Sequence, residues 1–451
     1  MISSRTCSIL TTSFIVFVGH GQSVYNDVAV IVNINDPVSV TIGNYFQAAR
    51  GIPAINMILI DAPLSETIDA AQFNDLRQQI EAHLIANDMV DSINFMVTTK
   101  GIPNRVSQSA CDTIPFTAGC TSFDSEITLI LGPESSQILS TNWVNSPYFG
   151  STIRQQRSLT GVYLVTRLDG YNENDVLDLI DRSGPGLMVD KALTSFIGDV
   201  SHADAPIIYL ANYNMFDAIL EPIESIGWTT YIDTLAAPLV GTSGVLGLLS
   251  YEEQPTTGLV PYQWANGALA FEFYAQAAAS FDPGLLDPVR LRAADLIASG
   301  ATGVVGAANY TYASAWSGAI FTFQRYVDTL GFGLAESYYA GIRYLSDMSV
   351  VVGDPKTSLV ISNTTAINES PSQQFQIHYD PNTSSITFAP FHLSTVSPYH
   401  IQLFDPVGHL LLSRALMPSD QVSVASLAPG AYVVRVGMVR EVFGAGRFVK
   451  Y

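Results

Sequence analysis

Five charged residues stand out in a chain that has few charges. Lys100, Arg167 and Asp169 each follow closely on an apolar run that predicts a buried strand. Asp124 and Glu126 lie two positions apart at the start of a predicted helix over 123–131. A lysine beside carboxylates can transfer a proton, and a group of carboxylates can hold a divalent cation. These five residues are therefore the candidate catalytic or metal-binding set.

The same residues also have a purely structural interpretation. Asp124 and Glu126 complement the positive end of a helix, and Arg167 can pair with either carboxylate. Asp169 followed by glycine is ordinary turn chemistry. Both interpretations stay open for this set. Three further carboxylates follow predicted strands and favour the structural interpretation: Glu252, Glu253 and Asp354.

Familiar catalytic motifs are missing from the sequence. It contains no glycine-rich phosphate loop, no Gly-x-Ser-x-Gly and no His-Glu-x-x-His. His83 and His202 are the only histidines between residues 22 and 363. Ligands of doubly wound sheets bind beyond the carboxyl ends of the strands, so the five candidate residues would share one crevice. We expect no cofactor, and the sequence names no substrate.

The charge balance excludes two classes of partner. Against 20 Lys and Arg the 451 residues carry 40 Asp and Glu, which gives a net charge of −20. Nucleic acid and anionic membrane surfaces are therefore poor partners. Charged residues make up 13% of the chain and hydrophobic residues 48%, which supplies a large core. A chain of this length predicts two or three domains.

The elements that must position these residues alternate between strand and helix. This order predicts an α/β fold, with a mostly parallel sheet or sheets flanked by helices. The predicted strands are 28–32, 57–60, 93–97, 161–166, 207–211, 231–232, 245–249, 302–305 and 349–352. The predicted helices include 38–50, 73–85, 176–181, 215–226, 268–278 and 290–298.

The last part of the chain has a different pattern. The whole negative charge lies before residue 364, and short alternating runs follow that are separated by turns at 406–408 and 428–430. We predict a small antiparallel β-sandwich over 376–451, after a linker at 363–375. The α/β body then divides into a first subdomain at 22–187, with a cysteine-containing loop, and a second at 188–362.

The N-terminus predicts export. A basic start, an apolar run over 7–18 and small residues at 19 and 21 are typical of a signal peptide at 1–21, although a buried first element is the alternative. No other run is long enough to span a bilayer. In an oxidising compartment, Cys111 and Cys120 would pair as a disulfide rather than remain free thiols. The mature protein would be secreted or held at the outer-membrane surface.

Five sequence blocks, in order, resemble a largely uncharacterised family of secreted bacterial proteins: residues 35–57, 98–103, 123–127, 161–170 and 350–355. That family is distantly similar to the gingipain and caspase-like cysteine peptidases, which implies a caspase-like fold. In those peptidases a His-Gly pair follows one strand and a nucleophilic cysteine follows the next. Here strand 245–249 is followed by Ser250-Tyr-Glu-Glu253, and strand 302–305 by Gly306-Ala-Ala-Asn309. Neither catalytic residue is present, so the acyl-enzyme route is closed.

The tail resembles the C-terminal (Por) sorting domain of proteins that the type IX secretion system of Bacteroidetes exports. The residues that carry this likeness are 401–408, 424–436 and 447–450. The resemblance implies that the secretion machinery is a partner of the tail. An appended sandwich that binds something else is the alternative.

Two functions follow from the sequence. The first is a secreted or cell-surface protein with a caspase-like body, no Cys-His dyad and a binding or structural role. The second is a hydrolase or metal-dependent enzyme that uses the five strand-end residues.

Overall fold

The computed structural model describes most of the chain between residues 24 and 450. The described residues are 24–107, 120–140, 143–200, 206–233, 242–250, 262–273, 276–284, 291–309, 311, 313–316, 318–328, 330–362, 377–388, 399–405, 410–416, 421–438 and 441–450. Several predicted features lie outside these ranges: the signal peptide, the linker at 363–375, Cys111, His202, Glu252 and Glu253. The predicted disulfide and linker therefore stay predictions, and so do the subdomain boundaries.

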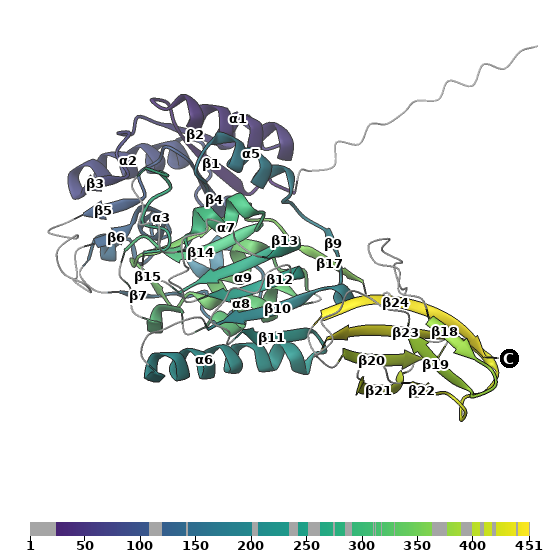
Figure 1. Cartoon of the computed structure of the whole chain (residues 1–451). Helices are drawn as coiled ribbons and strands as arrows, with labels where there is room; N and C mark the ends of the chain where they lie inside the picture. The colour runs from purple at the N-terminus through teal and green to yellow at the C-terminus, as the bar shows by residue number, and fades with distance from the viewer. Residues whose placement is uncertain are drawn as a thin grey trace, which may run out of the picture.

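Ten strands form one central sheet, which confirms the predicted α/β class (Figure 1). The five strands before β16 in this sheet pair in parallel with one another, and so do the four strands after it. In spatial order the strands are β11 (Thr229–Asp233), β10 (Ser195–Asp199), β12 (Ser243–Ser250), β13 (Gln263–Glu272), β14 (Gly303–Ala307), β16 (Ser349–Val352), β8 (Leu164–Leu168), β4 (Phe95–Thr99), β1 (Val28–Asn33) and β2 (Met57–Ile60).

Strand β16 joins the two halves of the sheet. It pairs antiparallel with β14 over its whole length. On its other side it meets β8 at Val352 and Arg167, where the Gly353 N–H donates to the Arg167 carbonyl at 2.9 Å. Strands from both predicted subdomains thus share one hydrogen-bonded sheet.

Helices cover both faces of the sheet, because alternate side chains of each strand point to opposite faces. In β1, Val28, Val30 and Val32 belong to one hydrophobic cluster, and Ala29 and Ile31 belong to another. Helix α1 (Pro37–Arg50) packs on the first face, and α2 (Ala70–Ala86) packs on the second. The other helices of eight or more residues are α5 (Glu173–Asp181), α6 (Pro206–Ser225), α8 (Ala319–Tyr326) and α9 (Leu334–Gly341).

Shorter elements surround the sheet. The helices among them are α3 (Phe123–Ile127), α4 (Arg157–Thr160) and α7 (Ala293–Ser299). Three small sheets are built from β3 (Thr67–Asp69), β5 (Arg105–Ser107) and β6 (Cys120–Ser122); β7 (Val144–Asn145) and β15 (Tyr344–Leu345); and β9 (Leu187–Asp190) and β17 (Leu359–Ser362).

The C-terminal region forms two antiparallel sheets, as predicted. One contains β18 (Ile377–Asp380), β19 (Ser385–Phe388) and β22 (Val422–Ser423). The other contains β21 (Leu410–Leu416), β20 (Tyr399–Phe404), β23 (Gly430–Met438) and β24 (Glu441–Lys450). They share a core of their own that includes Ile401, Leu403 and Val434.

Two predicted elements are wrong. Residues 207–211 begin helix α6, and residues 268–272, predicted as helix, belong to strand β13. Short apolar runs do not distinguish a buried strand from a buried helix. The alanines of β13 favour a helix intrinsically, but burial between β12 and β14 overrides that preference. Within the described segments, no helix is both long and apolar enough to cross a lipid bilayer.

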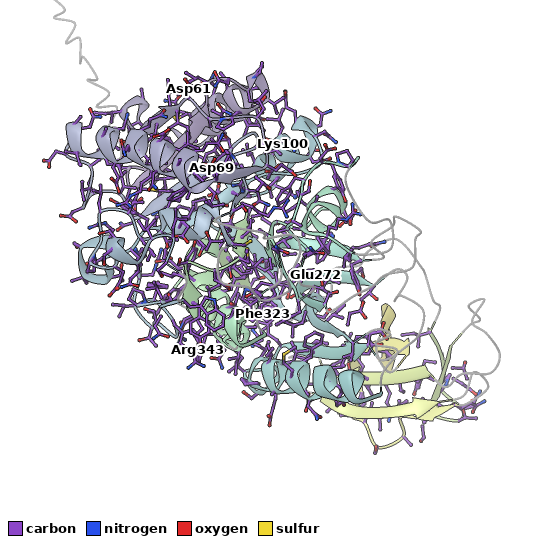
Figure 2. All side chains as sticks on the ribbon, turned by 90° about the vertical axis from the view of Figure 1, so that its left-hand side faces the viewer. Asp61, Asp69, Lys100, Glu272, Phe323 and Arg343 are labelled. Carbon is purple, nitrogen blue, oxygen red and sulfur yellow. The ribbon has the colours of Figure 1, made fainter. Side chains whose placement is uncertain are left out.

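A glycine in the middle of β12 tests the packing of the sheet. A Cβ on Gly247 would lie 2.1 Å from Phe196 Cδ1 and 3.1 Å from Phe323 Cε1 (Phe323 is labelled in Figure 2). We expect Gly247→Ala to lower the free energy of unfolding by about 1 to 3 kcal/mol through overpacking. The control is Gly284→Ala, where the nearest atom is Asp282 Oδ1 at 3.3 Å, at the end of an exposed side chain. Equal stability of the two variants in urea unfolding would contradict this packing.

Candidate functional site

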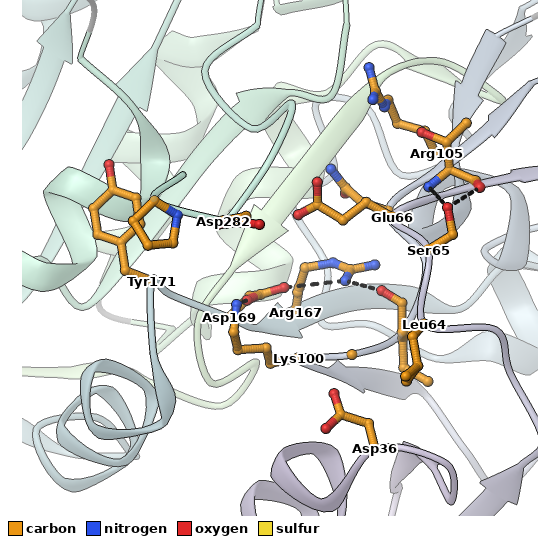
Figure 3. Close-up of a pocket in the computed structure, with 15 residues that line it drawn as sticks. Asp36, Leu64, Ser65, Glu66, Lys100, Arg105, Arg167, Asp169, Tyr171 and Asp282 are labelled. Carbon is orange, nitrogen blue, oxygen red and sulfur yellow. Dashed lines mark hydrogen bonds and ion pairs between the residues drawn. The ribbon is translucent and has the colours of Figure 1, made fainter. Parts of the chain in front are cut away.

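The carboxyl ends of β4 and β8 bring three of the five predicted residues together. The two strands are parallel neighbours, with Thr98 opposite Arg167. Lys100 follows β4 directly, Arg167 lies near the end of β8, and Asp169 follows β8. Figure 3 shows Lys100, Arg167 and Asp169 close together at this edge. Asp124 joins them from the first turn of α3.

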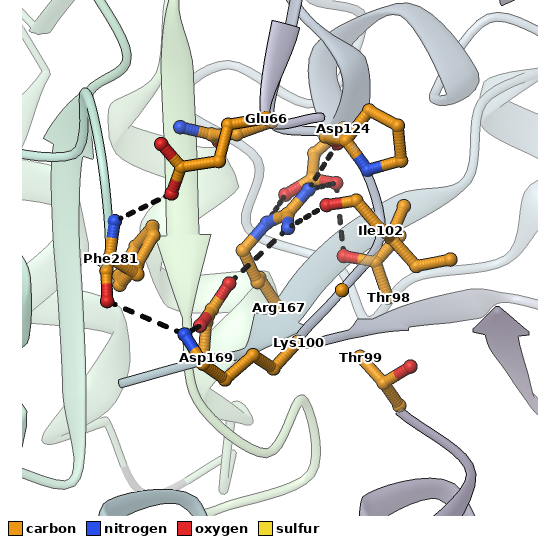
Figure 4. Close-up of polar contacts among 12 residues, drawn as sticks. Glu66, Thr98, Thr99, Lys100, Ile102, Asp124, Arg167, Asp169 and Phe281 are labelled. Atoms are coloured by element: carbon orange, nitrogen blue, oxygen red, sulfur yellow. Dashed lines mark hydrogen bonds and ion pairs between the residues drawn. The ribbon is translucent and has the colours of Figure 1, made fainter. Parts of the chain in front are cut away.

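Arg167 is completely buried, and each of its five N–H donors has an acceptor (Figure 4). Nε and Nη2 donate to the two carboxylate oxygens of Asp124, both at 2.9 Å. Nη1 donates to the Ile102 carbonyl at 2.9 Å and to Asp169 Oδ2 at 3.4 Å, and Nη2 also donates to the Pro103 carbonyl at 2.9 Å. Burial alone lowers the pKa of Arg167, but Asp124 and Asp169 together raise it above its ordinary value. The guanidinium is therefore a fixed charge.

Lys100 is the only cation of the set with a partly exposed side chain, at 22%. Its Nζ donates to Asp169 Oδ1 at 3.1 Å, to the Gly170 carbonyl at 2.8 Å and to the Phe281 carbonyl at 3.4 Å. An ammonium group has three donors, so these contacts occupy all of them. Lys100 ties the two halves of the sheet together, because Phe281 follows β13.

Glu126 is not part of this group, although it shares α3 with Asp124. Its carboxylate accepts hydrogen bonds from Ser346 Oγ at 2.6 Å and from the Leu139 N–H at 3.0 Å. Burial raises the pKa of Glu126, against the opposing effect of these bonds. Residues two apart on a helix point in different directions, which separates Glu126 from the other four.

Asp354 is also placed elsewhere. It is fully buried and accepts from the Tyr25 hydroxyl and from Arg50 Nε, both at 2.7 Å. Burial, followed by the charge of Asp354, raises the pKa of Tyr25 far above its ordinary value. These contacts connect the loop after β16 to the start of β1 and the end of α1.

A pocket of about 570 Å³ opens above the Arg167 network (Figure 3). This volume falls within the range of small-molecule sites. Lys100, Arg167 and Asp169 line it, and Asp124 lies beneath it. The other lining residues are Asp36, Leu64, Ser65, Glu66, Thr67, Gly101, Ile102, Asn104, Arg105, Tyr171, Asp282 and Pro283.

Sequence reasoning missed three acidic residues of this pocket: Asp36, Glu66 and Asp282. Asp36 follows β1 and Glu66 follows β2, so the strand-end argument that found Lys100 and Arg167 applies to both. Asp282 lies beyond β13, which the sequence presented as a helix. A correct assignment of β13 was the signal needed to find it.

The site offers more acceptors than reactive groups. Among the residues that the structure describes, no three His, Cys, Asp or Glu side chains are grouped so that they could hold a metal ion. Lys100 and Arg167 are held by hydrogen bonds, so they shape the pocket and fix its charge.

The other half of the sheet has a second row of polar strand ends. Asp233, Asp199, Ser250 and Glu272 are in register at the ends of β11, β10, β12 and β13, and all four are buried. The strand that follows β12 along the chain is thus β13, and it ends in Glu272 rather than in a cysteine (Figure 2). The expectation from the sequence had placed 302–305 there.

Comparison with known proteins adds little to this geometry. No family model and no curated protein matches the chain. One solved structure, described as "Structure of Protease", matches with a TM-score of 0.45 and 11% identity over 94% of this chain and 96% of its own. A likeness at this level carries no functional conclusion.

The buried ion pair predicts that two substitutions lower the free energy of unfolding by different amounts, although each replaces an acidic residue in the first turn of a helix. Asp124→Asn removes the carboxylate that binds the buried Arg167 through two oxygens and leaves only the longer contact with Asp169 at 3.4 Å. It should lower the free energy of unfolding by about 3 to 5 kcal/mol. Glu173→Gln, in the first turn of α5, should cost less than about 0.5 kcal/mol because its charge only faces the helix end. Chemical unfolding measures both. A small cost for Asp124→Asn would show that this carboxylate only decorates α3.

Asp347, behind α3, predicts a pH dependence of stability. Burial raises its pKa from 3.8 to about 6, although Thr311 Oγ1 donates to it at 2.7 Å. Between pH 4 and 6 the unfolded chain ionises this group first, so stability falls as the pH rises. The expected loss is on the order of 2 to 3 kcal/mol and is complete above pH 6. Asp347→Asn should remove this part of the decline. A stability difference between the two proteins that stays constant from pH 4 to 7 would contradict the assignment.

Proposed function

We propose that this chain is an exported binding protein, secreted or retained at the outer-membrane surface, that takes a ligand in the pocket at the ends of β1, β4 and β8. The observation that carries the proposal is the hydrogen bonding of two cations of this pocket, Lys100 and Arg167. Lys100 and Arg167 hold the pocket walls together through bonds that use all their donors. Such groups provide shape and charge for binding, whereas catalysis requires a group that can exchange a proton or attack.

The distribution of cysteine argues against cysteine-peptidase chemistry on these strands. The three cysteines are at positions 7, 111 and 120, so residues 121–451 contain none. Strands β10 to β14 and β16 all lie in that cysteine-free part. A thiolate nucleophile cannot come from these strands or from their loops. The peptidase likeness thus supports an α/β body of that type and not its activity.

The tail supports the proposal of export through a type IX system. Strand β24 is held to the turn between β22 and β23 by Lys450, whose Nζ donates to the carbonyls of Val424, Ala425 and Leu427 at 2.9, 2.8 and 2.6 Å. The terminal lysine that carries the resemblance therefore has a structural part in the tail. A secretion machinery that recognises the folded tail would contact β24 with its end fixed by these hydrogen bonds.

One experiment tests export and chemistry together. The full chain, with its leader, is expressed in a bacterium that has a type IX system, and the medium, surface and periplasm are separated. We expect the protein outside the cell, and a version that lacks 376–451 inside the outer membrane. The exported protein should also resist capture by a thiol-directed peptide probe.

Three results would contradict the proposal. The first is intact protein in the cytoplasm with its leader attached, and the second is stoichiometric capture by the probe. The third is hydrolysis of ester or peptide substrates that is lost in Lys100→Met. This last result would favour the alternative of a hydrolase at the same strand ends.

A further inference from the structure

Three side chains of the pocket, Lys100, Arg167 and Tyr171, have few hydrogen-bond donors left for a ligand. The donors of Lys100 and Arg167 are used within the protein, as described above. The hydroxyl of Tyr171, at the rim, donates to Asp295 Oδ1 at 2.6 Å. These three side chains therefore offer a ligand little donor capacity.

Acceptors, in contrast, remain available. The carboxylates of Asp36, Glu66 and Asp282 each accept one backbone N–H through one oxygen, at 2.9, 3.0 and 2.8 Å. Within the described part of the chain none of the three forms an ion pair. Among the described residues, no hydrogen bond reaches the second oxygen of any of the three, and all three residues line the pocket.

Asn104 provides an independent sign of a missing donor. It lines the pocket and is only 2% exposed. Its Nδ2 donates to the Ala278 carbonyl at 2.6 Å, but among the described residues its Oδ1 has no donor. A buried acceptor without a donor is costly, and a ligand N–H that reaches it removes that cost.

The charge of the pocket points the same way. With Asp124 beneath it, the pocket has five carboxylates and three cations, so an excess of negative charge remains. The carboxylates are Asp36, Glu66, Asp124, Asp169 and Asp282, and the cations are Lys100, Arg167 and Arg105. A positively charged ligand balances this excess.

We propose that the pocket binds a small organic cation with two or more amino groups, an inference that rests on the proposed binding function. Figure 3 shows Asp36 on one side of the pocket and Glu66 and Asp282 on the other, in three different segments of the chain. A single ammonium group meets one of them, and a diamine can meet two. Leu64, Ile102 and the ring of Tyr171 supply apolar wall for the methylene chain between the amino groups.

Three probes of equal length separate the possible ligand chemistries. Isothermal titration of the full chain uses 1,5-diaminopentane, the neutral 1,5-pentanediol and the dianion glutarate. We expect saturable binding of the diamine only, and weaker binding as salt is added.

Three isosteric variants locate the binding site. Asp36→Asn, Glu66→Gln and Asp282→Asn each keep the acceptor oxygen for the backbone N–H and remove the charge. At least two of the three should weaken diamine binding by about tenfold, the effect expected for loss of one charge-assisted hydrogen bond. The control is Asp69→Asn at the N-cap of α2, outside the pocket, which should bind as the parent does (Figure 2).

The outcomes separate the inference from the function on which it rests. Binding of glutarate or pentanediol but not of the diamine would overturn the inference and leave a binding pocket. Failure of all three probes at millimolar concentration would overturn both. Diamine binding that is unchanged in the three pocket variants would place the site elsewhere and overturn the inference.

Discussion

The buried charge of Arg167 is the constraint on which this edge of the sheet depends. A guanidinium that is fully removed from water is tolerated only when its donors are satisfied and its charge is matched. Its partners come from α3, from the turn after β4 and from Asp169. The turn needs Gly101, whose φ is +90° and whose Cβ would lie 2.0 Å from Asp36 Oδ2. One side chain thus fixes the positions of three segments.

For function, the consequence is a pocket whose base is fixed by hydrogen bonds and whose walls carry hydrogen-bond acceptors. The cations that drew attention in the sequence are part of the base, and the carboxylates of Asp36, Glu66 and Asp282 stand on the walls. The two halves of the sheet meet here through the contact of Lys100 with the Phe281 carbonyl. The arrangement supports recognition of a ligand.

Sequence reasoning predicted the class of fold and most of the strands, because buried parallel strands are continuous apolar runs. It placed Lys100, Arg167 and Asp169 at one edge, since strand ends are visible in a sequence. It grouped Glu126 with Asp124, although residues two apart on a helix point in different directions. It also mistook the alanine-rich strand β13 for a helix, and with that error it lost Asp282 and the correct neighbour of β12.

The most direct test of this account is a double-mutant cycle between Arg167 and Asp124. It compares urea unfolding of the parent, Arg167→Met, Asp124→Ala and the double variant. If the pair supports the pocket edge, each single change leaves an unmatched buried charge or a broken network, and the double variant costs much less than the sum. We predict a coupling energy of about 3 kcal/mol. The account would be contradicted if the losses of unfolding free energy in the two single variants summed to the loss in the double variant within about 0.5 kcal/mol.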